Sequence, residues 1–243
     1  MDNVSSHRNE ITDKGYTVVE GVFELAEIQQ IESAINEADQ SNSKFRKTTD
    51  LFAIRQFLKE VPTTIPHIFN DRLIGLINKL FGDNYFVVKS IYFDKPGTSN
   101  WFVAWHQDLT ISVDKKVVLS GYSNWTVKQD QFAVQPPLEL LEDNFTIRIH
   151  LDDANENNGA LKVVPGSHLK GVSRAEDINW DEETVDTCNV KCGGIMIMRP
   201  LLMHASDRTI NNEKRRVIHI EFSRTKLPEE INWSEMIEIK QSS

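Results

Sequence analysis

The sequence predicts a mainly β protein, an antiparallel sandwich or barrel, with helices gathered near its N-terminus. Two observations support this prediction. Two amphipathic helical patterns lie within the first 82 residues. Beyond them, short segments rich in β-branched and aromatic residues alternate with turn clusters such as NENNG, PGSH and INNEK. Because no long helical pattern separates these segments, an antiparallel architecture fits better than a βαβ sheet.

The N-terminal region supplies one short strand and two helices. Residues 15–20 (GYTVVE) are typical of a strand, and residues 24–38 repeat apolar positions at spacings of three and four. The apolar face of this first helix is formed by Leu25, Ile28, Ile31 and Ile35. A second helix is expected over 71–81, ending at Gly82 in a left-handed cap. Its buried residues are Leu73, Ile74, Ile77 and Leu80.

The remaining strands follow at short intervals. They are expected over residues 84–94, 145–151, 160–164, 194–198 and 217–222. Residues 100–142 hold three tryptophans and a proline pair, which predicts a long, partly ordered loop region over the mouth of the barrel. We therefore expect a single domain over 1–243, with its β core at about 84–224 and a helical region at 24–82 packed against it.

Composition excludes several classes of function. The chain has 243 residues, 40% of them hydrophobic, which is enough for one sizeable core. A net charge of −9 without a basic stretch argues against nucleic-acid binding. No apolar run approaches the ~20 residues of a membrane helix, and the polar N-terminus lacks the core of a secretory signal, so a cytoplasmic protein is expected. Cys188 and Cys192 are expected to be reduced thiols, because no second cysteine pair completes a zinc site.

Three histidine–carboxylate pairs at i, i+2 are candidate metal ligands, because alternate residues of a strand share a face. The pairs are His106–Asp108, His150–Asp152 and His219–Glu221. The first follows an aromatic, loop-like segment (NWFVAW), which suits a site at a barrel mouth. The second enters a turn, where Asp152 would accept turn hydrogen bonds. The third lies in mid-strand on the polar face that also carries Arg215, which favours a pocket-lining role for His219.

A third ligand should come from a distant strand. His204 follows the apolar run IMIMRPLLM. Alone, such a histidine is more often structural, but Ser206 and Arg215 follow it at short distances. Two imidazoles and one carboxylate leave three octahedral positions open, which suits non-haem iron(II). The HExxH motif of many zinc hydrolases is absent from the sequence.

With these residues in view, the sequence resembles the phytanoyl-CoA dioxygenase family of iron- and 2-oxoglutarate-dependent oxygenases. Three ordered blocks carry the resemblance: WHQDL around His106, HLDDANENNGALKVVPGSHLKG over 150–171, and RPLLMHASDRTINNEKRRVIHIEF over 199–222. The likeness extends over about residues 15–224. It implies a double-stranded β-helix (jelly-roll) fold with flanking helices, and the use of Fe(II), 2-oxoglutarate and O2.

The resemblance also implies roles for individual residues. Iron would be bound by His106, Asp108 and His204. Arg215 would pair with the distal carboxylate of 2-oxoglutarate, assisted by Ser206, because a guanidinium grips a carboxylate through two parallel hydrogen bonds.

Further contacts are expected from neighbouring strands. Thr146 and Arg148 share a strand face, and Arg148 is expected to contact cosubstrate or an acidic substrate group, unless it forms a structural ion pair. Arg216 points to the opposite face from Arg215 and is interpreted as a surface charge. A basic or polar contact to cosubstrate is also expected from residues 44–59.

The implied activity is hydroxylation of a small-molecule metabolite, with release of succinate and CO2. Candidate substrate-pocket residues are Gln107, Trp105, Trp125, Gln135 and His219. The alternatives are a non-catalytic jelly-roll binding protein, a metal-dependent hydrolase, and an oxygenase of acyl-CoA substrates. Coenzyme A would favour a basic groove, and the chain offers only scattered lysines such as Lys115, Lys116 and Lys128.

Overall fold

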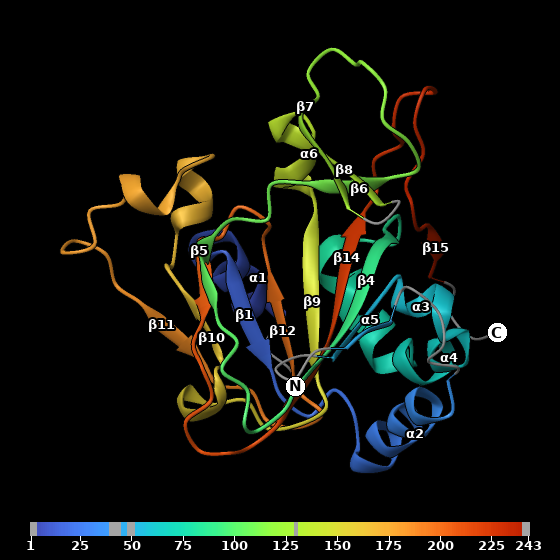
Figure 1. Cartoon of the computed structure of the whole chain (residues 1–243), viewed down its shortest axis with the longest axis vertical. Helices are drawn as coiled ribbons and strands as arrows, with labels where there is room; N and C mark the ends of the chain where they lie inside the picture. Colours follow the sequence, from blue (N-terminus) through green and yellow to red (C-terminus); the bar gives the residue numbers. More distant parts are fainter. Residues whose placement is uncertain (1–3, 39–44, 48–51, 129–130, 240–243) are drawn as a thin grey trace.

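The computed structural model describes residues 4–38, 45–47, 52–128 and 131–239. Figure 1 shows long central strands, a smaller sheet to their left and a group of helices to their right. The arrangement is mainly antiparallel β with flanking helices, as the sequence predicts. Among the described residues, no helix is long and apolar enough to cross a membrane.

The large sheet holds most of the strands expected from the sequence. Its order is β1-β12-β9-β14-β4-β3-β2, with β15 also paired to β4, and the pairs are antiparallel. The strands are β1 (Tyr16–Val19), β2 (Phe45–Lys47), β3 (Phe52–Arg55), β4 (Phe86–Lys95), β9 (Phe145–His150), β12 (Ile195–Met198), β14 (Arg215–Ser223) and β15 (Ile237–Glu238). The predicted strands at 15–20, 84–94, 145–151, 194–198 and 217–222 are confirmed, within one or two residues at their ends.

A smaller antiparallel sheet lies beside the large one (Figure 1). Its order is β11-β10-β13-β5. The strands are β5 (Val103–His106), β10 (Leu161–Val163), β11 (Asp186–Cys188) and β13 (His204–Ser206). Apolar residues of β10 and β11 form a cluster with Met196 and Met198 of β12 in the large sheet. The two sheets therefore pack face to face, with part of the core between them.

The expectation of a long loop over residues 100–142 is wrong. Besides β5, this region forms a three-stranded sheet, ordered β6-β8-β7, and a short helix. The elements are β6 (Ile111–Val113), β7 (Ser123–Lys128), β8 (Gln131–Gln135) and α6 (Leu138–Asp143). The strands of this sheet are short and only one face packs on apolar neighbours, so Trp125 and the polar residues around it do not form an alternating pattern that predicts strands.

Helices cover the other face of the large sheet. They are α1 (Val4–Lys14), α2 (Leu25–Asn36), α3 (Phe57–Glu60), α4 (Ile65–Ile68) and α5 (Asp71–Phe81). Short 3-10 helices lie at Pro62–Thr64, Glu156–Asn158, Ser167–Lys170 and Ala175–Asp177. The predicted helix over 71–81 is confirmed. Gly82 has a positive φ of 95°, which its lack of a Cβ permits, but its ψ of 178° lies outside the left-handed helical region, so the expected left-handed cap is wrong. The helix α1 was not predicted, since its only buried residue is Ile11.

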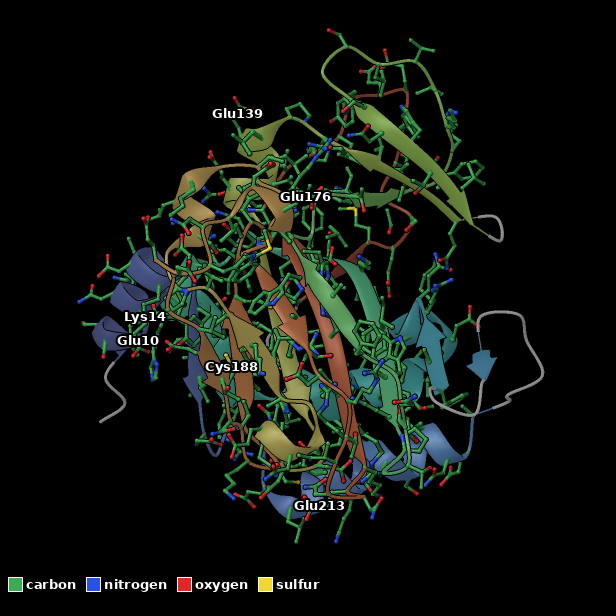
Figure 2. The ribbon with its side chains drawn as sticks, turned by 60° about the vertical axis from the view of Figure 1, so that its left-hand side comes forward. Glu10, Lys14, Glu139, Glu176, Cys188 and Glu213 are labelled. Atoms are coloured by element: carbon green, nitrogen blue, oxygen red, sulfur yellow. The ribbon has the colours of Figure 1, made fainter. Side chains whose placement is uncertain are left out.

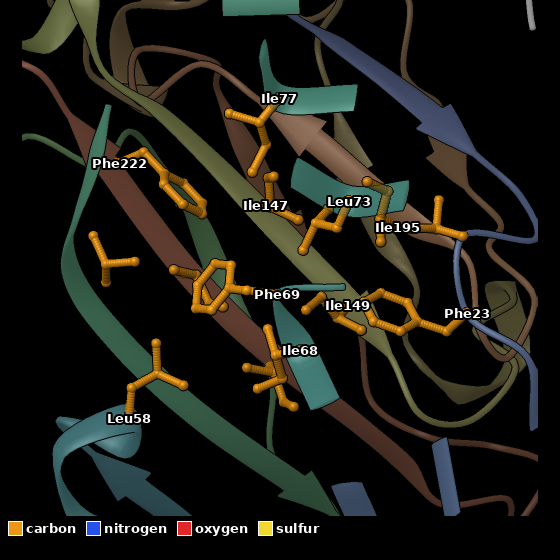
Figure 3. Packing of buried hydrophobic residues seen from close by; sticks show 14 of the residues in the cluster. Phe23, Leu58, Ile68, Phe69, Leu73, Ile77, Ile147, Ile149, Ile195 and Phe222 are labelled. Atoms are coloured by element: carbon orange, nitrogen blue, oxygen red, sulfur yellow. The ribbon is translucent and has the colours of Figure 1, made fainter. Parts of the chain in front are cut away.

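The main core lies between these helices and the large sheet. Figure 3 shows Leu73 and Ile77 of α5 packed towards Ile147 of β9 and Phe222 of β14. The exposed fraction of each of these side chains is 2% or less. Burial of one such side chain contributes about 1.5–3 kcal/mol. Alternate residues of β9 and β14 are used here, so the residues between them face the small sheet.

The structure contradicts the expected burial of Leu25 and confirms the expectation about the two cysteines. Leu25 is 66% exposed, so its assignment to the buried face of α2 is wrong; it is the first residue of the helix, ahead of the turns that pack on the sheet. Both cysteines are free, as predicted. Cys188 lies inside the molecule on β11 (Figure 2), and burial raises the pKa of its thiol to about 12.

The segment after β14 is fixed to the large sheet by a buried carboxyl group. Glu235 is 1% exposed, and its oxygens accept hydrogen bonds from the backbone N–H of Ser90 (2.7 Å) and from its hydroxyl (2.6 Å). Burial raises the pKa of Glu235 to about 7, opposed by these hydrogen bonds and by the charge of Lys59, and reinforced by Glu221. Glu235 thus binds its proton more tightly in the folded protein than in the unfolded chain.

A Glu235→Gln variant is expected to lose less stability than the wild type as the pH rises. The folded pKa lies above the ordinary value of 4.5, so the contribution of Glu235 is fully present below pH 4.5 and declines towards about pH 7. The difference is on the order of 3 kcal/mol. Urea unfolding of both proteins at pH 5 and pH 8 measures it. Equal losses in the two proteins would contradict the assignment.

Candidate metal and cosubstrate site

Two histidines from distant parts of the chain lie opposite each other in the small sheet. His106 ends β5, His204 begins β13, and the two residues are direct cross-strand partners. Their ring centroids are 4.2 Å apart, as expected for side chains on one face of an antiparallel pair. The segment before His106 is therefore a strand and not the loop that its aromatic residues suggested.

Hydrogen bonds fix the orientation of both imidazoles. Nδ1 of His106 lies 2.8 Å from the carbonyl oxygen of Ala104, and Nδ1 of His204 lies 2.8 Å from that of Leu202. A carbonyl oxygen can only accept, so each Nδ1 carries the proton and each Nε2 presents a lone pair. Metal-binding histidines commonly donate a hydrogen bond from their second ring N–H in this way.

Asp108 supplies a carboxylate to the same point. Its backbone N–H donates to the carbonyl of Pro200 (2.9 Å), which fixes the chain after β5. Its oxygens lie 3.8 Å from Nε2 of His106 and 3.8 Å from Nε2 of His204. Burial would raise the pKa of Asp108, but the electrostatic influence of His204, His219, Lys89 and His106 holds that pKa below its usual value.

This donor set fits a metal ion. One ligand atom from each of His106, Asp108 and His204 lies within 4.8 Å of the other two. The Oδ2 atom of Asp108 is buried and has no hydrogen-bond partner among the described residues. A buried ionised oxygen without a partner is costly, and a cation between the two Nε2 atoms would satisfy it. Two imidazoles and one carboxylate suit iron(II) with open coordination positions.

The second histidine–carboxylate pair does not converge. His150 faces the interior and neither of its ring nitrogens has a partner among the described residues. Asp152 instead accepts hydrogen bonds from the Arg216 guanidinium at 2.8 Å, and Glu32 of α2 binds the same guanidinium. The interpretation of Arg216 as a surface charge is therefore wrong: its side chain is 13% exposed because α2 covers this face of β14.

A cavity of about 230 Å³ opens beside the candidate ligands, between the two sheets. Its lining residues are Lys89, Ile91, Phe93, Lys95, Trp101, Val103, His106, Asp108, Arg148, Leu161, His204, Ser206, Arg215 and His219. Three of its cations, Lys95, Arg148 and Arg215, have no carboxylate at ion-pair distance among the described residues. The cavity thus carries an excess of buried positive charge.

Several polar atoms around the cavity lack partners in the part of the chain that the structure describes. They include Nε of Arg215, Nε of Arg148, Oγ of Ser206 and Oγ1 of Thr146. Arg215 is 4% exposed and Ser206 3%, and burial together with Arg148 lowers the pKa of the Arg215 guanidinium. Unsatisfied buried donors cost free energy, so this set is suited to an anionic ligand rich in acceptor oxygens. Thr146 lies two residues before Arg148 on β9 but is not among the residues that line the cavity.

A chain of hydrogen bonds crosses the sheet beneath the candidate ligands. Lys89 donates to Glu221 (2.6 Å), His219 Nε2 lies 3.1 Å from Glu221, and Arg148 donates to His219 Nδ1 (3.2 Å). Arginine is only a donor, so Nδ1 accepts and Nε2–H donates to Glu221. Although Asp108, His219 and Glu221 are also close enough to share an ion, these hydrogen bonds already occupy the last two. His219 lines the cavity and positions Arg148.

A Glu221→Gln variant should disturb this chain of hydrogen bonds. The amide oxygen can still accept from Nε2–H of His219, and Arg148 still donates to Nδ1, so the tautomer is expected to stay, whereas Lys89 loses its counter-charge. We expect a fall on the order of 2 kcal/mol in the free energy of unfolding. Imidazole ¹⁵N shifts report the tautomer and urea titration the stability, with exposed Glu182→Gln as control. A shift of His219 to the Nδ1–H tautomer, or a free energy of unfolding equal to that of the wild type, would contradict the hydrogen-bond assignment.

Most of the residues expected in the substrate pocket lie elsewhere. The side-chain amide of Gln107 donates hydrogen bonds to the carbonyl oxygens of Gly171 and Leu201 and accepts one from the backbone N–H of Ser173. Trp105 packs against Trp180 at 4.9 Å between centroids. The other two lie in the three-stranded sheet: Trp125 packs on its apolar cluster, and Gln135 accepts a hydrogen bond from Asn124. Of the five candidates, only His219 lines the cavity.

The cavity wall contains residues that the sequence analysis did not identify. Lys89, Ile91, Phe93 and Lys95 alternate along one face of β4. This period of two, with lysines at both ends, is a signal that the sequence contains. Within 44–59, where a cosubstrate contact was expected, residues 44 and 48–51 lie outside the described residues. The described Arg55 and Gln56 line a second cavity.

Comparisons with known proteins agree with this geometry. The chain is 26% identical over 212 residues to a probable alpha-ketoglutarate-dependent hypophosphite dioxygenase of Stutzerimonas stutzeri, with 73% of this chain aligned. The alignment spans 62% of that relative's length. Among solved structures, EctD from S. alaskensis in its apoform superposes with a TM-score of 0.73 at 18% identity, covering 98% of this chain and 87% of that one.

A second solved structure shows the same fold. The non-heme alpha ketoglutarate dependent carbocyclase SnoK from nogalamycin biosynthesis superposes with a TM-score of 0.67 at 15% identity, covering 90% of this chain and 83% of that one. These likenesses confirm the predicted jelly-roll architecture with flanking helices. The family model described as Phytanoyl-CoA dioxygenase (PhyH) matches residues 11–217. Because the match covers most of the sequence, the chain belongs to the phytanoyl-CoA dioxygenase family.

Proposed function

We propose that this protein is an iron(II)- and 2-oxoglutarate-dependent dioxygenase that hydroxylates a small-molecule metabolite and releases succinate and CO2. One observation carries the proposal. Two Nε2 lone pairs and an ionised carboxylate converge in the same cavity as a buried arginine that lacks a carboxylate partner. The relative from S. stutzeri, described as alpha-ketoglutarate-dependent, supports it.

In this proposal His106, Asp108 and His204 hold the iron. When bound, iron(II) with 2-oxoglutarate supplies the activation of O2 and the oxidising power for the substrate. The protein's part is to hold the two imidazoles by their Nδ1–H donors and to keep Asp108 ionised. The carbonyls of Ala104 and Leu202 prevent the rings from turning, so both lone pairs stay directed at one point.

Arg215 and Ser206 hold the distal carboxylate of 2-oxoglutarate at the end of the cavity. Both are buried and both have an unsatisfied donor, and a guanidinium binds a carboxylate through two parallel charge-assisted hydrogen bonds. Arg148, fixed by His219, adds a second positive charge along the cosubstrate, and Thr146 on the same face of β9 is a further candidate contact. Phe93, Trp101 and Leu161 form apolar walls that exclude water from the reacting groups.

The cavity size favours a small substrate. At about 230 Å³, it lies below the usual range for drug-sized ligands, and cosubstrate would fill part of it. This argues against a long acyl-CoA chain. The S. stutzeri relative is described as acting on hypophosphite, a small anion, and the cationic lining of this cavity is compatible with an anion of that kind. On this proposal the helices and sheets act as a single oxygenase domain, because apolar clusters join the helices, the small sheet and the three-stranded sheet each to the large sheet.

Succinate formation tests the proposal. Protein with iron(II), 2-oxoglutarate and ascorbate is exposed to O2, and succinate is quantified with and without candidate small anions. We expect slow formation without substrate and faster formation with it, and none when zinc replaces iron. A non-catalytic binding protein would bind iron and 2-oxoglutarate without forming succinate, and a hydrolase would bind no 2-oxoglutarate. Either result would overturn the proposal.

A further inference from the structure

A second cavity of about 270 Å³ adjoins the first. The two share Lys89 and Ile91 of β4 as a common wall. The lining of the second cavity comes from β3, β4, the three-stranded sheet and the segment at Ser234 and Glu235. Thus the sheet that replaces the expected loop at 100–142 closes a space directly beside the candidate metal site.

Most of the residues that line this second cavity are polar. Hydroxyl groups come from Thr110, Ser112, Thr126 and Ser234, whereas the hydroxyl of Ser90 already donates to Glu235. Glu235 turns both of its oxygens to Ser90, and Lys89 is neutralised by Glu221. The guanidinium of Arg55 has no hydrogen-bond or ion-pair partner among the described residues. Arg55 is therefore the one lining cation of this cavity whose charge is not offset within the described part of the chain.

The register of the sheet places this cavity towards the other end of β4 from Arg215, the residue proposed to bind 2-oxoglutarate. Arg215 is paired with Lys95 at one end of β4, His219 with Ile91, and Glu221 with Lys89 at the other end. Arg55 on β3 is paired with Ile91, so both side chains face the same side. Six residues of strand separate Lys95 from Lys89, roughly 20 Å. Asp108 lies between these two lysines, close to His219 and Glu221.

We propose that the second cavity binds the oxyanion end of the substrate, a carboxylate or a phosphonate-type group, with Arg55 as its positively charged partner. This inference rests on the proposed function and names its substrate class. A guanidinium beside several hydroxyl donors provides hydrogen bonds that an oxyanion can accept in full. A neutral molecule would leave the charge of Arg55 unmatched. The remainder of the substrate extends past Lys89 and Ile91 towards the metal ligands.

The same geometry separates the two anions of the reaction. Arg215 and Ser206 hold cosubstrate at one end, while Arg55 holds substrate at the other, with the candidate ligands in the middle. Residues 44–59 were expected to contact 2-oxoglutarate. In this proposal the described part of that segment contacts substrate instead, because Arg55 lines the second cavity and not the first.

Calorimetric titration with small probes tests the inference. Methylphosphonate, propionate and neutral 1-propanol are titrated into the full chain loaded with Mn(II) and 2-oxoglutarate. We expect one or both anions to bind and the alcohol not to bind; the stronger of the two identifies the oxyanion. Arg55→Gln is expected to weaken anion binding at least about tenfold, and Arg55→Lys to weaken it less. The dissociation constant for 2-oxoglutarate should stay unchanged in both variants.

Two controls make the outcome specific. Arg174→Gln removes an exposed arginine outside both cavities and should leave anion binding intact. The titrations are repeated without Mn(II) and 2-oxoglutarate, so Arg55-dependent anion binding is measured even if the chain fails to bind cosubstrate. That failure would count against the proposed function alone. Equal anion binding by wild type and Arg55→Gln, or binding of neither anion under both conditions, would overturn the inference.

Discussion

The His204→Ala variant is expected to lose at least about 100-fold in affinity for iron(II), together with all iron-dependent succinate formation. Loss of groups that merely orient a ligand already costs about 10–100-fold in metal affinity, so loss of a ligand should cost more. The substitution removes one of two Nε2 lone pairs and leaves Asp108 with a single imidazole. Equilibrium dialysis under anaerobic conditions, followed by measurement of bound iron, gives the affinity.

The matched control for this experiment is His150→Gln. His150 belongs to the histidine–carboxylate pair that does not converge, and Asp152 beside it is already bound by Arg216. This variant should therefore retain bound iron. Circular dichroism of both variants verifies that each remains folded. Iron bound to His204→Ala as tightly as to the wild type would contradict the ligand assignment.

The Arg215→Gln variant is expected to raise the KM for 2-oxoglutarate by at least about 100-fold. Removal of one partner from a buried ion pair costs about 3–5 kcal/mol, and each 1.4 kcal/mol corresponds to a factor of ten. Affinity for iron should change little, because Arg215 is not among the residues that converge on the metal position. Succinate formation as a function of 2-oxoglutarate concentration gives KM and kcat separately.

The neighbouring residue provides the control for Arg215. Arg216 lies on the opposite face of β14, where it binds Asp152 and Glu32. Arg216→Gln should therefore lower the free energy of unfolding without changing the KM for 2-oxoglutarate. If both variants raised KM equally, or if Arg215→Gln left it unchanged, the cosubstrate would have to bind elsewhere.

Local periodicity made much of the fold predictable. The helix at 71–81 and the strand at 145–151 were found because apolar residues recur at the spacing of each element. Leu25 was misassigned because periodicity identifies a helical face but not where its contact with the sheet begins. The strands within 100–142 were missed because short strands that pack on one face lack a continuous apolar pattern.

The candidate site was predictable where its residues repeat at short spacing. His106 and Asp108 are two apart, and the resemblance added His204 and Arg215. Gln107 was misplaced in the pocket, although the residue between two that share a face points away from them. Lys95 is accessible from the period of two along β4, whereas Arg55 is not, because its position depends on how β3 and β4 pair, which one sequence does not reveal.

The central claim is that His106, Asp108 and His204 share one iron ion. Diffraction from crystals grown anaerobically with iron(II), recorded on both sides of the iron absorption edge, tests it most directly. The structure predicts one anomalous peak at bonding distance from the two Nε2 atoms and the Asp108 carboxylate. An iron peak at His219 and Glu221, or at any position that excludes His204, would contradict it.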